Sequence, residues 1–349
     1  MNYRKVHLGF TIVTGIAMIL FVSITLSPAL SADEKPPVES TAAHIHPLAT
    51  ETGWSSGWFD IAPGTTHVFT HNLGGDVGDY AVELLFQDTD ANGLGVHTFG
   101  YGGYEENGQW EGGYWSDLTA STISVHRMAN DETADRMRVR VWFMTPADYD
   151  SGWQAITPTL PLTLTHNLGG DSEDYTLGLW FQDAALDGYG IHNRYFGSVE
   201  HAGQYEGAHW QNLDNTSIRV ARWADDLHVD EVRVRMIETP PEPDYDSDWQ
   251  TINAGETLTL THNVGGRVGM YRLILQYRDA SGLPTSFGQN ARWAGGEAVG
   301  SNLVGGHWQR LTNSTVELYR QPGGSRDTEI RLRIWKREYT IFLPLVTSE

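Results

Sequence analysis

Two glycine-rich loops of this 349-residue chain contain side chains whose chemistry suits ligand binding. The candidate binding residues are Tyr101, Tyr104, Trp110 and Glu111 in the first loop, and Tyr195, Tyr205 and Glu206 in the second. Exposed aromatic rings stack on the C–H faces of sugars, and neighbouring carboxylates and amides fix the hydroxyls. We therefore expect these loops to bind carbohydrate or another cell-surface polymer. The alternative is that the rings are part of a core.

A short acidic loop precedes the first aromatic loop and suggests a metal site. Asp88, Asp90 and Asn92 place oxygen ligands at alternate positions before Gly93, as in the first half of a calcium loop. The closing glutamate of such a loop is missing, because Phe99 occupies the twelfth position. Calcium is thus the one cofactor that the sequence suggests, and an Asn-Gly hairpin turn explains the same residues without a metal.

The sequence argues against an enzyme. Glu111 and Glu206 could pair with Asp88 and Asp183, but no nucleophile elbow, metal-binding histidine pair or phosphate loop accompanies these acids. Triplication also raises avidity for a repeated ligand more directly than it raises turnover. We expect a binding protein without catalytic residues, or else a structural or adhesive envelope or matrix protein.

The chain is a triplicate with a period of about 95 residues. The hexapeptide Thr-His-Asn-Leu-Gly-Gly begins at residues 70 and 165 and returns with Val for Leu at residue 261. Each copy has a tryptophan before it (Trp58, Trp153, Trp249) and another after it (Trp115, Trp210, Trp308). We expect the later tryptophans to be core rings, because they keep their place while the residues around them change.

Period-two alternation predicts an all-β fold. It is clearest in the last strand of each copy, where apolar residues alternate with arginine over residues 136–142, 232–236 and 330–335. Such alternation predicts one buried face and one wet face. Several short strands separated by Gly, Asn and Asp turns predict three tandem antiparallel β-sandwiches or flattened barrels. We expect His71, His166 and His262 to be structural, each bonding the glycine turn that follows it.

The predicted boundaries follow composition. Residues 1–32 form a signal segment, either cleaved or kept as an anchor, and residues 33–52 form a flexible tether. The β-sandwich repeats span 53–146, 151–239 and 247–336, and residues 337–349 form a tail. The short proline-containing linkers favour a semi-rigid rod of separate cores. This organisation predicts a secreted or cell-surface protein that touches a membrane only through an uncleaved signal segment.

Charge excludes one class of partner. Without residues 1–32 the chain has 21 Lys plus Arg against 44 Asp plus Glu, so we expect no nucleic-acid binding. The third repeat is the exception, with more basic than acidic residues, and its surface could pack against the acidic repeats. The absence of cysteine means that each repeat needs its own hydrophobic core.

Three resemblances add to this interpretation. An early tryptophan, a strand, a short glycine turn and a strand that begins with tyrosine resemble the H-type lectin β-sandwiches. The Thr-His-Asn-Leu-Gly turn is similar to β-modules of phage tail fibres. Nearly all of each repeat resembles an uncharacterised family of repeats in exported bacterial proteins, which implies no activity. The first two resemblances imply a secreted binding module, and the lectin resemblance also implies a homo-oligomer.

Overall fold

The computed structural model describes residues 53–90, 93–97, 104–106, 109–144, 146–183, 191–192, 198–201, 204–222, 226, 229–238, 242–278, 295–299, 302–322 and 328–336. All of them lie in one compact unit, Ile45–Glu349. The signal segment, the tether and the tail lie outside the described residues, and the expectations for them stay predictions. No helix among the described residues is long and apolar enough to cross a membrane.

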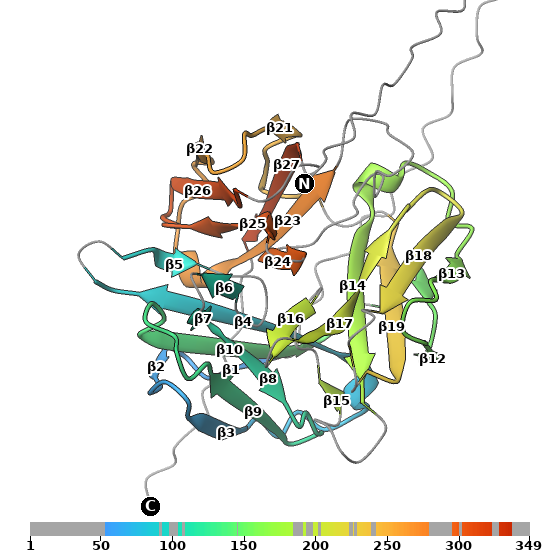
Figure 1. Ribbon diagram of the computed structural model, residues 1–349, viewed down its shortest axis with the longest axis horizontal. Helices are drawn as coiled ribbons and strands as arrows, with labels where there is room; N and C mark the ends of the chain where they lie inside the picture. Colours follow the sequence, from blue (N-terminus) through green and yellow to red (C-terminus); the bar gives the residue numbers. More distant parts are fainter. Residues whose placement is uncertain are drawn as a thin grey trace, which may run out of the picture. The chain divides into compact units, whose positions relative to one another are not determined.

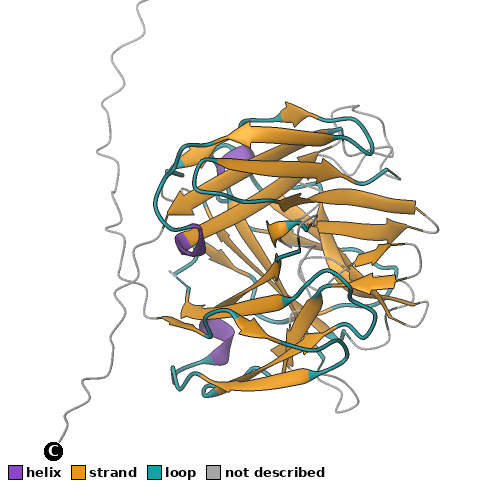
Figure 2. Cartoon of the chain, turned by 90° about the vertical axis from the view of Figure 1, so that its left-hand side faces the viewer, coloured by secondary structure: helices purple, strands orange, loops and turns teal. Residues whose placement is uncertain are grey.

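The all-β prediction is confirmed. The described residues form antiparallel strands joined by loops and three short 3-10 turns, as Figure 2 shows. Each copy of the repeat contains two main sheets, and none of the sheets described is closed into a barrel. Residues from both sheets of a repeat share one core cluster, which is the arrangement of a β-sandwich.

The first repeat contains one sheet of order β1-β10-β4-β5, with β2 also pairing with β10, and a second of order β3-β9-β8. A separate hairpin pairs β6 with β7. The bounds are β1 Gly53–Ser55, β2 Phe59–Asp60, β3 Thr66–Thr70, η1 Val77–Asp79, β4 Tyr80–Asp88, β5 Gly95–His97, β6 Tyr104–Glu106, β7 Gln109–Glu111, β8 Gly113–Ser116, β9 Thr122–Arg127 and β10 Arg136–Phe143.

The second repeat follows the same plan. One sheet has the order β11-β19-β14-β15, with β12 also on β19, and the other has the order β13-β18-β17-β16. The bounds are β11 Tyr149–Asp150, β12 Gln154–Ala155, β13 Leu162–Thr165, η2 Ser172–Asp174, β14 Thr176–Gln182, β15 Ile191–His192, β16 Ser198–His201, β17 Gln204–Gln211, β18 Ser217–Arg222 and β19 Glu231–Ile237.

In the third repeat, β27 pairs with β20, β21 and β23, and the other sheet has the order β22-β26-β25-β24. Figure 1 shows the third repeat in the orange and red part of the chain, with β21 to β27 labelled. The bounds are β20 Tyr245–Asp246, β21 Gln250–Thr251, β22 Thr257–Thr261, η3 Val268–Met270, β23 Tyr271–Arg278, β24 Gly295–Val299, β25 Asn302–Gln309, β26 Thr315–Arg320 and β27 Glu329–Lys336.

The later tryptophan of each repeat is a core ring, as predicted. Trp115, Trp210 and Trp308 are 1%, 4% and 2% exposed, and each belongs to the core cluster of its own repeat. A ring of this size buries more apolar area than any other side chain, so it anchors the packing of the two sheets. This result confirms that these three tryptophans belong to the fold.

The repeated hexapeptide is a turn held by its histidine, as predicted. His71 is buried, and its Nδ1 accepts a hydrogen bond from the backbone N–H of Leu73 at 3.2 Å. Gly74 and Gly75 have φ angles of 69° and 81°, which favour glycine, and the Tyr80 hydroxyl donates to the Gly74 carbonyl. His166 and His262 accept the same bond at the same length from Leu168 and Val264.

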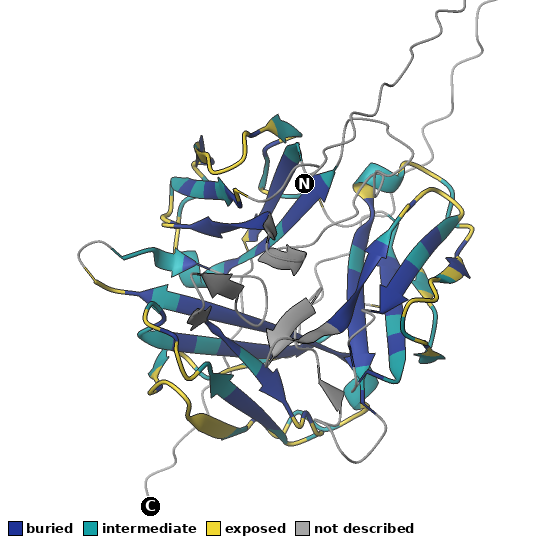
Figure 3. Cartoon of the chain, viewed as in Figure 1, coloured by how far each residue is buried: buried dark blue, intermediate teal, exposed yellow. Residues whose placement is uncertain are grey.

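The arginine face of the last strand is not wet, contrary to the sequence prediction. Arg140 is 2% exposed and forms an ion pair with Glu83 of β4 at 2.6 Å, and Glu83 is 3% exposed. Figure 3 shows β4 and β10 buried along most of their length. Alternation correctly separated the two faces of the strand, but both faces are covered, one by its own core and the other by another repeat.

Buried and half-buried arginines of the last strands donate to backbone carbonyls of a neighbouring repeat. Arg140 bonds the carbonyl oxygens of Gly269 and Tyr271 in the third repeat, both at 3.0 Å. Arg233 of the second repeat bonds the carbonyl of Gly78 in the first at 2.7 Å. Arg331 of the third repeat bonds the carbonyl of Glu173 in the second at 3.2 Å. The contacts therefore run from repeat 1 to 3, from 3 to 2 and from 2 to 1, which closes a cycle.

The expectation of a rod with separate cores is wrong, because the first repeat packs against the third. Leu85 of β4 belongs to the core cluster of the third repeat, and Trp58 and Val96 pack against the same cluster. The expected packing of the more basic third repeat on an acidic one is found, since Arg278 pairs with Glu173 at 2.6 Å. The linkers therefore connect repeats that also share side-chain contacts.

The three cores predict different behaviour for isolated repeats. The cluster of the second repeat contains only its own residues, whereas that of the third includes residues of the first. We expect a fragment of residues 146–239, which keeps β11 on β19, to unfold cooperatively in urea, and a fragment of residues 242–336, which keeps β20 on β27, to lose more of its stability on excision. Absence of a cooperative transition in the 146–239 fragment, measured by circular dichroism, would show that the second repeat does not fold as a separate domain.

Candidate functional site

The predicted aromatic loops form β-hairpins. In the first repeat, Tyr104 lies opposite Glu111 in the register of β6 and β7, and Trp110 lies opposite Glu105. In the second repeat β16 and β17 pair Glu200 with Tyr205 and Val199 with Glu206. In the third repeat β24 and β25 pair Ala298 with Leu303. Tyr101 and Tyr195 lie outside the described residues.

A glycine with a positive φ angle marks the base of each hairpin. Gly112, Gly207 and Gly305 have φ angles of 88°, 104° and 86°. Only glycine adopts this region without strain, so the strand changes direction there. The carbonyls of Gly112 and Gly305 accept backbone bonds from Met128 at 2.9 Å and from Gln321 at 2.8 Å. The hairpin therefore begins at a fixed point of the sandwich.

A buried carboxylate holds this base in the first repeat. Asp131 is 2% exposed, and its Oδ1 accepts a hydrogen bond from the N–H of Gly112 at 2.9 Å. Its Oδ2 pairs with Arg127 Nε at 2.5 Å, and Arg127 Nη1 donates to the carbonyl of Ile61 at 2.7 Å. One carboxylate thus connects the hairpin base to the end of β9 and to the loop after β2.

The second repeat has the same arrangement, which the sequence reasoning missed. Asp226 accepts a hydrogen bond from the N–H of Gly207 and pairs with Arg222 at 3.0 Å. The signal in the sequence is an arginine at the end of β9 and of β18 with an aspartate four residues later. In the third repeat Gly324 stands at the position of this aspartate. These residues position the hairpins without belonging to them.

The hairpins of the three repeats contact one another. Strands β6, β16 and β24, one from each repeat, lie against each other, and Figure 1 shows them side by side. Strand β5 of the first repeat also contacts β25 of the third, and β15 of the second contacts β8 of the first. The structure therefore brings the predicted binding segments Tyr104–Glu106, Gln109–Glu111 and Gln204–Gln211 into one region.

The predicted metal loop is organised by its first aspartate. Asp88 is 7% exposed, and its two carboxylate oxygens accept backbone bonds from Asp90 at 3.2 Å and from Leu94 at 2.8 Å. The N–H of Gly93 donates to the Asp90 carbonyl at 2.8 Å, which is a turn. Asn92 lies outside the described residues. Within the part of the chain that is described, no group of three or more His, Asp or Glu residues could hold a metal ion.

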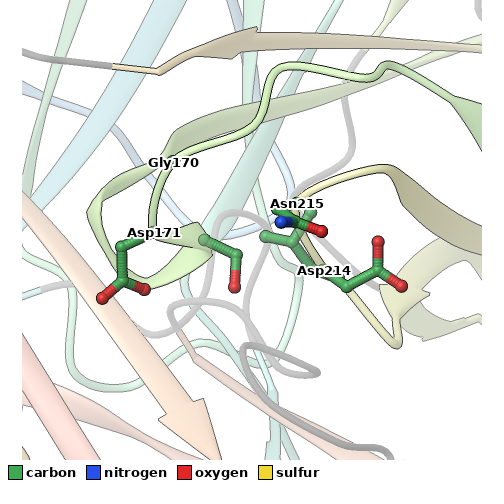
Figure 4. Close-up of a pocket in the computed structure, with 6 residues that line it drawn as sticks. Gly170, Asp171, Asp214 and Asn215 are labelled. Carbon is green, nitrogen blue, oxygen red and sulfur yellow. The ribbon is translucent and has the colours of Figure 1, made fainter.

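A shallow hollow lies beside the glycine turn of the second repeat, and Figure 4 labels four of the residues that line it, Gly170, Asp171, Asp214 and Asn215. The carboxylates of both aspartates accept hydrogen bonds from backbone N–H groups two residues further along the chain. Asp171 accepts the N–H of Glu173 at 2.9 Å and begins η2. Hydrogen bonds from Thr216 and Ser217 lower the pKa of Asp214. This hollow is therefore explained by turn geometry.

Comparison with known proteins identifies no relative. The chain matches no protein-family model and no curated protein sequence. The resemblances described above therefore stay interpretations of the repeat pattern, and the function has to be argued from the arrangement of the hairpins.

The Asp131 contact predicts a large effect of a single substitution. Asp131→Ala removes the carboxylate that pairs with the half-buried Arg127 and leaves the Gly112 N–H without its acceptor, and such a change costs about 3–5 kcal/mol. Urea denaturation of the Asp131→Ala chain measures this loss. The matched control is Asp60→Ala, which breaks an exposed pair with Arg136 and should cost at most about 1 kcal/mol. Equal stability of the two variants would show that Asp131 does not hold the hairpin base.

Proposed function

We propose that this chain is an exported, non-catalytic binding protein that takes carbohydrate or another cell-surface polymer on the hairpins of its first two repeats. The observation that supports this proposal is the mutual contact of β6, β16 and β24. Three hairpins that meet form one composite region, so residues that are about 95 positions apart in the sequence act together. A polymer offers repeated units, and several linked contacts raise its affinity more than one contact does.

The residue types in this region suit a polar, ring-shaped ligand. Trp110 and Tyr205 occupy the same position of the hairpin in repeats 1 and 2, and Glu111 and Glu206 follow them. Aromatic rings supply flat apolar area, and carboxylates accept hydrogen bonds from hydroxyls. The third repeat has Leu303 and Val304 at these positions. Ligand contacts are therefore expected from the first two repeats, with the third completing the assembly.

A second function draws on the same observation. Hairpins that contact one another also bury surface, and the aromatic residues would then serve the packing of the three repeats. In that case the protein is a structural or adhesive component of an envelope or matrix, and it needs no small ligand. The two functions differ in what Trp110 and Tyr205 contribute, which is binding in one case and stability in the other.

Substitution of the two rings separates these functions. We expect the chain without residues 1–32 to bind at least one class of glycan on an array, and Trp110→Ala and Tyr205→Ala each to weaken binding about tenfold or more, because stacking on a ring is lost. Thermal unfolding of each variant should stay within a few degrees of the parent chain.

The matched control is Leu303→Ala, which removes the side chain at the same hairpin position in the third repeat and should leave glycan binding unchanged. Trp110→Phe keeps an aromatic ring and should retain most of the binding. Absence of binding to any glycan, together with strong destabilisation by Trp110→Ala and Tyr205→Ala, would favour the structural function.

Calcium in the Asp88 loop stays a prediction. If Asp88, Asp90 and Asn92 bind calcium, a chelator should lower the melting temperature of the chain, because a ligand that binds only the native state stabilises it. Asp90→Ala should abolish this shift. An equal melting temperature in millimolar calcium and in chelator would contradict calcium binding, and the loop would then be a hydrogen-bonded turn without a metal.

A further inference from the structure

Strand β3 of the first repeat is the edge strand of its sheet. The sheet has the order β3-β9-β8, and among the described residues only β9 pairs with β3. The N–H of His71 donates to the carbonyl of Ser121, which follows this pairing, at 2.7 Å. Backbone groups alternate between the two sides of a strand, so those of Thr66, Val68 and Thr70 point away from β9. This edge therefore offers the N–H and the carbonyl of these three residues to another strand.

Apolar surface lies on the outer side of this edge. Val68 is 68% exposed, more than any other large hydrophobic residue that the structure describes. Figure 3 shows most of β3 in the exposed colour. Ser124 of β9 stands opposite Val68, and the other outward residues of the two strands are threonine and histidine. The outer side of the edge thus carries no acidic side chain.

A group of aromatic rings lies on the inner side of the edge, between the two sheets. The ring of Phe59 lies 5.5 Å from that of His67 and 4.7 Å from that of Phe69, measured between centroids, and Trp54 lies 5.7 Å from Phe69. His67 is exposed and the other three are half-buried, so their own repeat covers them only in part. In both other repeats a glutamine stands at the position of Phe59.

The corresponding edges of the other two repeats are protected against pairing. Arg219 stands opposite Thr163 in the second repeat, and Glu317 stands opposite Thr259 in the third. Pro161, which has no N–H, directly precedes β13. Charged residues and proline are common means of preventing association at sheet edges. Strand β3 and the residues of β9 paired with it contain no proline, lysine, arginine or acid.

The sequence of β3 is self-complementary about its central residue. An antiparallel copy centred on Val68 places Thr66 opposite Thr70 and His67 opposite Phe69. Threonine pairs and aromatic pairs both stabilise neighbouring strands. The chain has a formal net charge of −21, so two copies repel each other except where the surfaces in contact lack acids. A second copy of this chain is therefore the partner that this edge fits.

We propose that β3 is a self-association site, at which two copies of this chain pair antiparallel about Val68 and extend the sheet β3-β9-β8 across both molecules. The outward backbone groups of Thr66, Val68 and Thr70 then bond those of the second copy. The exposed valines meet on the outer side of the joined sheet, and the aromatic groups meet on its inner side. This association is independent of the proposed ligand binding.

The experiment uses residues 33–349, which contain the whole compact unit Ile45–Glu349. Two short strands bury a small interface, so sedimentation equilibrium should find monomer at about 1 μM and dimer at about 100 μM. Val68→Lys should weaken the association about tenfold or more, because two ammonium groups then face each other. Thr163→Lys and Thr259→Lys, the matched controls at the equivalent positions of the other repeats, should leave it unchanged.

The Val68→Lys chain should keep its fold. Its side chain is exposed, and its N–H points away from β9. We therefore expect an unchanged far-ultraviolet circular dichroism spectrum and a melting temperature within a few degrees of the parent chain. Loss of the dimer together with loss of the fold would not count as support, and the cysteine variants below then decide.

Single cysteines test the register, because the chain has no cysteine of its own. Val68→Cys should form a disulfide-linked dimer on mild oxidation, since facing residues of such a pair have Cα atoms about 5.5 Å apart. Thr66→Cys alone should not, because its copy lies four positions further along the pair, at about 13 Å. An equimolar mixture of Thr66→Cys and Thr70→Cys chains should cross-link, since these two positions face each other.

Three results would overturn the proposal. The first is a parent chain that stays monomeric at about 100 μM, or a dimer that the folded Val68→Lys chain retains. The second is equal cross-linking of the Val68→Cys and Thr66→Cys chains, which would indicate random collision. The third is a dimer that forms only after residues 33–52 are removed as well, which would show that the tether occupies the edge.

Discussion

The assembly of this protein depends on hydrogen bonds from buried arginines to backbone carbonyls of another repeat. Arg140, Arg235 and Arg333 are 2%, 5% and 3% exposed, and they occupy equivalent positions in the last strand of their repeats. A guanidinium buried this deeply needs acceptors for its five N–H groups. The carbonyls around the 3-10 turn that precedes the central strand supply part of them, and each guanidinium also forms an ion pair with a carboxylate. In the second and third repeats Asp150 and Asp246 take that role, and in the first Glu83 does.

The strands, the core tryptophans and the glycine turn could be predicted from local patterns. Strict alternation in residues 136–142 identifies a strand regardless of what covers it, and a large ring retained in three copies identifies a core. The surroundings of the arginine face could not be predicted in this way. An arginine that points to water and one that points to another repeat have the same period, so alternation cannot distinguish the buried Arg140 from the half-buried Arg136 of the same strand.

Local patterns also fail to predict how the candidate site is assembled from the three repeats. The sequence indicated which residues of the loops are aromatic, and the structure adds that the three hairpins meet. The bases of the first two hairpins are held by Asp131 and Asp226, which lie about 20 residues after the glycines that they bond. Pairing over that distance has no periodic signature, and only the recurrence of arginine and aspartate in two repeats indicates it. Residues that position a site are therefore harder to find in a single sequence than residues that belong to it.

The cyclic order of the contacts has a consequence for the first and third repeats. Each repeat carries both the last strand, whose arginines donate, and the 3-10 turn, whose carbonyls accept, so each repeat is complementary to the others. In a cycle of three repeats, every such strand meets a turn of another repeat. A linear array of repeats must end in specialised caps that cover its last interfaces. Among the described residues the cycle of contacts takes the place of such caps, because each donor strand meets an acceptor turn of another repeat.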